Sequence, residues 1–346
     1  MEDKANSRLR YIDTAKAVAM YLIVVGHTQL YAPACKWIYT FHVPLFFFIS
    51  GFLFSYDRNP CFKYFLRKRT RQIIIPYAAI NIATYTIWLA AGRHLTHTPE
   101  SASAEWWHPL LCSAVGLGGG IVHDMALWFL PCLFNIEIVY YVLFRGRRRG
   151  VVALMAVMAA VVGMAACQRH GGGTPLFMGQ TAVSLLFYAA GHMARELRCT
   201  FLNLWVAAVA VALSAVCTIF NNSINYANNE YGNGVLFYTG ALSGIYIMMC
   251  LCRLAERTFQ AMPAIISRSV HRAVRIVADN TLWICGFHLL ALSLVKGLLI
   301  FAAHYDISKL EGSLLGNVAM AAVGMAVCTF ATMQMRKFVI KKQDMT

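Results

Sequence analysis

Charged side chains are scarce in this chain of 346 residues, because only 13% of them are Asp, Glu, Lys or Arg. A soluble domain carries roughly 25% charged residues. The mean hydropathy is +0.57, and 59% of the residues are hydrophobic. The length would allow two soluble domains, but the apolar content instead predicts an all-α, polytopic integral membrane protein.

Signatures of several other protein classes are also missing. The 11 cysteines form no Cys-x-x-Cys pair and lie mostly in apolar segments, which favours buried thiols over a zinc site or a disulfide framework. We therefore expect no metal. Residues 1–17 are polar, and no small-residue cleavage site follows the first apolar segment, so no signal peptide is indicated. Without repeats or a soluble appendage, 1–346 is expected to form a single transmembrane domain.

Long apolar segments account for most of the chain. A membrane-spanning helix needs roughly 17–25 mainly apolar residues. Ten segments are interpreted as spans, at about 14–31, 39–56, 73–92, 126–144, 151–167, 180–194, 201–220, 234–252, 279–302 and 313–335. The sequence thus predicts about ten transmembrane helices.

The basic residues indicate the orientation of these helices. With the N-terminus placed inside, most of the 30 Lys and Arg residues fall on the inner side, whereas the outer loops hold Lys36, Arg93, Arg169 and Lys309. This asymmetry follows the positive-inside rule and predicts that both termini are cytoplasmic. The net charge of +15 is then mainly topogenic, so no nucleic-acid partner is expected. The basic segment 253–278 is expected to lie along the inner leaflet as an amphipathic helix.

A few ionisable residues interrupt the predicted spans, and each costs about 2.5–3.5 kcal/mol on insertion scales. Such residues are functional candidates by default. They are His27, His42, Glu137, His192, His288 and Lys296.

His27 lies roughly 20 Å from the inner end of the first span, and His42 begins the second span from the outside. The two imidazoles are expected to meet in the outer third of the bilayer, where one could act as a general base on a hydroxyl. The alternative is a pair of histidines that are simply hydrogen-bonded near the interface. Glu137 lies roughly 13 Å below Trp128 and needs a partner, for which His27, Lys296 or a substrate hydroxyl would serve.

The segment FLRKRTRQIIIPY at 65–77 places four basic residues just before the third span. Topology alone can explain any one of them. Arginine also binds phosphate in a bidentate manner, so Arg69 and Arg71 could hold a phosphorylated donor. In FFFISG at 46–51 the phenylalanines are expected to pack, and Ser50–Gly51 forms a thin spot where a chain or a ligand could pass.

Five segments together resemble a known family. They are YIDTAKAVAMYLIVVGH, FHVPLFFFISGFLF, RKRTRQIIIPY, LWFLPCLF at 127–134 and NTLWICGFHLL at 280–290. In this order they are similar to the membrane acyltransferase-3 family, on its fucose 4-O-acetylase-like branch.

The resemblance implies a bacterial plasma-membrane O-acyltransferase of the cell envelope that modifies polysaccharide. It would move an acetyl group from cytoplasmic acetyl-CoA, its co-substrate, to a hydroxyl of an extracytoplasmic sugar or glycan. The essential histidine of the family falls on His27, and a polar pair falls on Asp13 and Lys16. The basic motif falls on Arg69 and Arg71, although the family often has Arg-x-x-Arg and this chain has Gln72 at the last position.

The expected site combines both lines of inference. The expected catalytic residues are His27, Glu137 and His42, with Glu137 orienting the imidazole of His27. The expected donor-binding residues are Arg69, Arg71, Lys68 and Lys16, and the expected acceptor-binding residues are Asp13, Ser50, Trp128 and His288. Expected partners are membrane lipid, the glycan, acyl-CoA and either a second copy or a separate extracytoplasmic transferase. The alternative is a transporter or flippase for a glycan or acylated metabolite.

Overall fold

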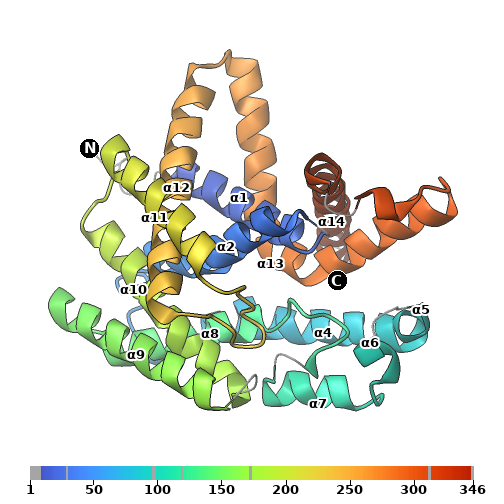
Figure 1. Ribbon diagram of the computed structural model, residues 1–346, viewed down its shortest axis with the longest axis horizontal. Coiled ribbons are helices and arrows are strands. Elements are labelled where there is room, and N and C mark those ends of the chain that lie inside the picture. Colours follow the sequence, from blue (N-terminus) through green and yellow to red (C-terminus); the bar gives the residue numbers. More distant parts are fainter. Residues whose placement is uncertain are drawn as a thin grey trace.

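The computed structural model describes residues 9–28, 30–95, 99–117, 120–170, 174–310 and 313–343. Across these ranges the chain is helical, and the β-structure is limited to an isolated bridge between Asn225 and Glu230. Figure 1 shows the helices arranged as one bundle from which a long pair of helices projects.

The first half of the chain forms short and long helices in alternation. They are α1 (Arg10–Gly26), α2 (Ala32–Leu53), α3 (Phe62–Arg69), η1 (Thr70–Ile74), α4 (Ile75–Ile87), η2 (Trp88–Gly92), α5 (Arg93–Leu95), α6 (Pro99–Ser103), α7 (His108–Val115) and α8 (Phe129–Phe144). The second half consists of longer helices. They are α9 (Arg149–His170), η4 (Pro175–Phe177), α10 (Met178–Glu196), α11 (Leu204–Phe220), α12 (Gly234–Ala261), α13 (Ala264–Phe301), η5 (Ile307–Leu310) and α14 (Leu314–Gln343).

Each of the ten predicted spans overlaps one of these helices. Among the described residues, six helices are long and apolar enough to cross a membrane, and α8 and α11 are apolar but shorter. The six are α2, the continuous stretch Phe62–Gly92, α9, α12, α13 and α14. The chain is thus a multi-pass membrane protein, while the full count of ten and the side of each terminus stay predictions.

Two glycines allow α2 and α10 to pack in backbone contact. A Cβ placed on Gly51 would lie 1.9 Å from the carbonyl oxygen of Tyr188, and one on Gly191 would lie 2.0 Å from that of Phe48. Small residues permit such close helix approach in membranes. Of the two alternatives expected at Ser50–Gly51, a chain or a ligand, the chain of α10 takes the place beside Gly51.

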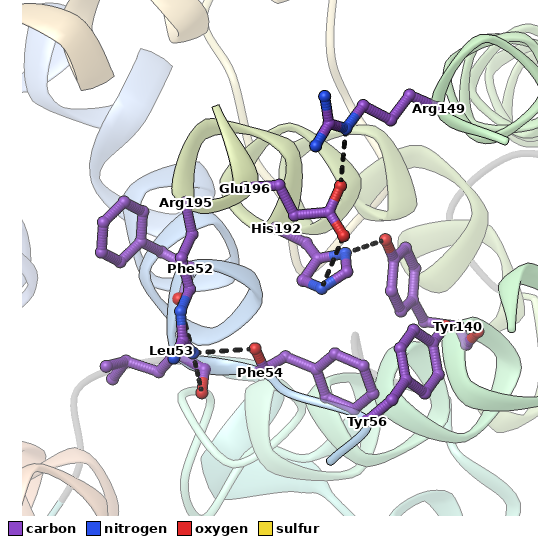
Figure 2. Close-up of polar contacts among 9 residues, drawn as sticks. All are labelled: Phe52, Leu53, Phe54, Tyr56, Tyr140, Arg149, His192, Arg195 and Glu196. Carbon is purple, nitrogen blue, oxygen red and sulfur yellow. Dashed lines mark hydrogen bonds and ion pairs between the residues drawn. The ribbon is translucent and has the colours of Figure 1, made fainter. Parts of the chain in front are cut away.

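The C-terminal end of α2 is fastened by polar groups from α10 and α8 (Figure 2). The Arg195 guanidinium donates to the carbonyls of Leu53 at 3.2 Å and Phe54 at 3.0 Å, which satisfies acceptors that a helix end leaves unpaired. His192 lies between the Tyr140 hydroxyl, at 2.8 Å from Nδ1, and Glu196, whose Oε1 is 3.8 Å from Nε2. We assign this cluster a structural role.

The basic segment 253–278, expected to lie along the inner leaflet as an amphipathic helix, forms the end of a projecting hairpin of α12 and α13 (Figure 1). Only Met262–Pro263 interrupts the helical pattern there, and the position of the hairpin relative to the leaflet stays a prediction. The 38 residues of α13 span about 57 Å, well beyond a hydrocarbon core of roughly 30 Å. The hairpin arms are joined by an ion pair between Glu256 and His271 at 3.1 Å.

Candidate active site

A cavity of about 280 Å³ lies among α1, α2, α8 and α13, with η1 on one side. We call it the central cavity. Its polar lining comes from Lys16, Ser50, Arg69, Gln72, Glu137, Thr281 and Cys285. Its apolar lining includes Ile23, Phe46 and Phe129. The structure therefore brings three predicted donor or catalytic residues, Lys16, Arg69 and Glu137, to one place.

Arg69 and Glu137 form a buried ion pair in this lining. Arg69 Nε lies 2.8 Å from Glu137 Oε2, and the two side chains are 22% and 3% exposed. The pair is held by charge and proximity, because its N–H is not aligned for a hydrogen bond. The structure thus gives Glu137 a partner, Arg69, that was not among those expected. The expected role of Glu137 in orienting His27 stays a prediction.

The basic motif presents Gln72 to the cavity rather than Arg71. Both residues are exposed, but of the two only Gln72 lines the cavity, where its Oε1 accepts a hydrogen bond from Arg69 Nη1 at 3.0 Å. The two residues that face inward keep the family's spacing of three. A π-helical turn, η1, begins directly after Arg69, and such turns are frequent at functional sites. Lys68 lies outside the lining and donates to Asn59 Oδ1 at 3.2 Å.

Three histidines lie one helical turn beyond the apolar end of the central cavity. His27 follows Ile23 by four residues and caps the C-terminal end of α1. His42 precedes Phe46 by four residues in α2, and His288 follows Cys285 by three in α13. The ring centroids of His27 and His288 are 5.0 Å apart, and His42 lies within electrostatic reach of His27. We call these three residues the histidine cluster.

Hydrogen bonds define the tautomer of two members. His288 Nδ1 lies 2.8 Å from the Cys285 carbonyl oxygen, and His42 Nδ1 lies 2.8 Å from that of Ile38. A carbonyl only accepts, so each Nδ1 carries the hydrogen and each neutral ring keeps its lone pair on Nε2. His288 is fully buried, and its Nε2 has no hydrogen-bond partner among the described residues. This nitrogen is a buried base beside His27.

The remaining predicted acceptor residues are dispersed. Ser50 lines the central cavity. Trp128 is only 5% exposed and stacks on Tyr226 at 5.6 Å and 9°, so its face is covered and does not offer a sugar platform. Asp13 lines a different pocket, beside Arg10 and the α12–α13 hairpin. His288, in contrast, is a direct neighbour of His27.

The sequence pattern did not reveal some residues that the structure brings to the site. Cys285 and Thr281 reach the cavity because α13 packs on α1, a contact between distant segments. Asp124 lies outside the lining of the central cavity. It is 2% exposed in the loop before α8, and burial raises the pKa of its carboxyl well above the ordinary value. Among the described residues, no group of three or more His, Cys, Asp or Glu side chains could hold a metal ion.

Comparison with known proteins identifies the family of this chain. No curated protein and no solved structure matches the chain. Residues 9–333 match the family Acyl_transf_3, described as an acyltransferase domain. This range contains α1, the basic motif, the LWFLP segment and His288. The fucose 4-O-acetylase-like branch stays a prediction. Since the match covers nearly the whole chain, the protein belongs to the membrane acyltransferase-3 family.

Proposed function

We propose that this membrane acyltransferase transfers an acetyl group from cytoplasmic acetyl-CoA to a hydroxyl of an extracytoplasmic sugar or glycan. The carrying observation is the histidine cluster, which lies one helical turn beyond the apolar end of a cavity whose other end holds Lys16, Arg69 and Gln72. The polar end, where Glu137 pairs with Arg69, would face the donor, and an imidazole beyond the apolar end suits a hydroxyl that must lose its proton.

The proposed step needs one proton acceptor. The acceptor hydroxyl gives its proton to the imidazole of His27, its oxygen forms a bond with the thioester carbonyl carbon, and the carbon–sulfur bond breaks. The proton then passes to the departing CoA thiolate. In a second version His27 Nε2 or Nδ1 takes the acetyl group first and passes it to the hydroxyl. The buried Nε2 of His288 stabilises an imidazolium at His27 in either version.

The test uses purified full-length protein, acetyl-CoA carrying a labelled acetyl group and an envelope glycan as acceptor. We expect His27→Ala to lower kcat at least about a hundredfold, the ordinary contribution of a positioned acid–base group. His94→Ala, at an exposed histidine, serves as the control and should keep its rate. A folded His27→Ala protein that transfers acetyl at the unaltered rate would falsify the proposal.

The transporter hypothesis predicts movement of a glycan without consumption of acetyl-CoA. The same preparation in vesicles separates the two functions. Glycan export that is independent of acetyl-CoA and insensitive to His27→Ala would favour transport. Rapid quenching with mass spectrometry of the peptide around His27 distinguishes the acyl-carrier version from the general-base version.

A further inference from the structure

A second pocket of about 640 Å³ lies between the first turn of α1 and the projecting hairpin. We call it the basic pocket. It is lined by Arg10, Asp13, Ser267, Arg268, His271, Arg272, Val274 and Arg275. The sequence analysis assigned its basic residues only to topology and to the inner leaflet.

The pocket carries a clear excess of positive charge. Four guanidinium groups face one carboxylate, that of Asp13, in its lining. Of the other acidic groups nearby, Glu256 binds His271 at 3.1 Å, and Asp279 binds Arg275 at 3.5 Å. Arginine forks suit phosphate oxygens. The chemistry therefore indicates a ligand with clustered phosphates.

Contacts within the α12–α13 hairpin, and between the hairpin and α1, hold the basic pocket in shape. Arg253 stacks on the Tyr11 ring at 4.2 Å, which joins the hairpin to α1. His271 is held by Glu256 across the hairpin and by the Ser267 carbonyl at 2.7 Å. These contacts fix the spacing between Arg10 on α1 and the arginines on α13.

The basic pocket and the histidine cluster are joined along one side of α1. Successive site residues on this helix are Arg10, Asp13, Lys16, Met20, Ile23 and His27, three or four residues apart. Such spacing places side chains on one helix face. From Asp13 to His27 the helix rises about 21 Å, a length comparable to an extended phosphopantetheine arm. The central cavity lies between the two ends.

The charges of the central cavity are too few for the phosphates of CoA. Lys16 and Arg69 line it together with Glu137, which pairs with Arg69, and Arg71 is exposed outside it. CoA carries a 3′-phosphate as well as a diphosphate. Resting on the proposed function, we propose that the basic pocket binds the 3′-phospho-ADP portion of the acyl-CoA donor, while the pantetheine arm runs along α1 toward His27.

Binding is tested on the full chain in nanodiscs of neutral lipid, with adenosine 3′,5′-bisphosphate as the probe. We expect the double variant Arg268→Gln/Arg272→Gln to weaken binding at least tenfold. The matched control Arg147→Gln/Arg148→Gln removes the same charge from exposed residues of the loop before α9 and should leave affinity unaltered. In the transfer assay the first variant should raise KM for acetyl-CoA tenfold with kcat unchanged, whereas KM for 3′-dephospho-CoA should move little.

An anionic lipid headgroup offers similar phosphate chemistry, so nanodiscs containing phosphatidylglycerol form a separate arm. Unaltered bisphosphate affinity in the double variant, with loss of phosphatidylglycerol enrichment, would overturn the proposal in favour of a lipid site. Normal transfer with an unaltered KM would overturn it as well. Bisphosphate binding that depends on Arg268 and Arg272 in a protein without acetyl transfer would refute the proposed function but support the pocket.

Discussion

The environment of individual side chains separates structural from chemical roles in this protein. Glu137 and His288 are both buried ionisable residues of the spans, and sequence alone treats them alike. Glu137 is neutralised by Arg69 at 2.8 Å, whereas His288 presents an unbonded Nε2 beside His27. Burial makes each a candidate, and the partner determines what each can do.

The Arg69–Glu137 pair should contribute strongly to stability, because removing one member leaves a buried charge uncompensated. We expect Glu137→Gln to lower the free energy of unfolding by about 3 kcal/mol. Adding Arg69→Gln should cost less than the sum of the single changes. The exposed Arg149–Glu196 pair, at 3.0 Å, is the reference, and Arg149→Gln should cost about 1 kcal/mol or less. Additive effects at Arg69 and Glu137 would contradict the pairing.

His123, in the loop before α8, should make stability depend on pH. Burial lowers the pKa of its imidazole to about 4, whereas the unfolded chain titrates near 6.5. Stability is then complete above about pH 6.5 and falls as pH drops toward 4, because only the unfolded state takes up the proton. The loss is at most about 3 kcal/mol.

Thermal unfolding in detergent between about pH 4.5 and 7.5 measures this dependence. His123→Phe keeps a ring to pack against Tyr85, whose centroid lies 5.7 Å away, and should flatten the acid side of the profile. His94→Phe, at an exposed position, should leave its slope intact. An unchanged slope in His123→Phe would assign the acid sensitivity to other groups.

At the scale of elements, close helix packing depends on a few glycines. Gly51→Ala and Gly191→Ala each force a methyl group against a backbone carbonyl, which cannot move aside as a side chain does. We expect each to lower stability by at least about 2 kcal/mol. Gly297→Ala in α13 meets nothing within 4 Å and should be neutral or slightly stabilising. Equal melting temperatures for the three variants would show that α2 and α10 can separate without cost.

The elements themselves were largely predictable, since runs of apolar residues mark helices wherever a membrane is the solvent. The residues at which these helices begin and end were not predictable from runs of apolar residues. Hydropathy locates the middle of α13 but gives no sign that this helix continues unbroken into the basic segment 253–278, where α12 and α13 form a hairpin. The directions in which Arg71 and Gln72 point also depend on a π-helical turn. Such a turn changes which residues share a helix face, and it leaves no signal in the hydropathy.

At the scale of the molecule, the site depends on contacts that no local pattern encodes. His27 and His288 meet across 261 positions of sequence because α1 packs on α13. The resemblance to the family identified His27, whereas its contact with His288 is seen only in the folded structure. The sequence did predict on which side of the membrane most basic residues lie. This asymmetry is a property of the whole chain, and measuring the orientation of the chain tests it.

Orientation can be measured with cysteines already present. Cys61 and Cys199 are exposed in connections expected on the cytoplasmic side. A membrane-impermeant maleimide should modify them in inside-out vesicles and not in intact cells. Asn222→Cys, in the exposed loop before α12, should show the reverse pattern. Labelling of Cys61 or Cys199 from outside intact cells would invert the topology.

The apolar end of the central cavity has an electrical consequence. A protein that receives reactants from both membrane faces risks offering protons a wet path between them. Ile23, Phe46 and Phe129 line the end of the cavity nearest the histidine cluster, and apolar linings of this kind disfavour water. Under the proposed function, this apolar end would keep the proton gradient of the cell insulated during transfer.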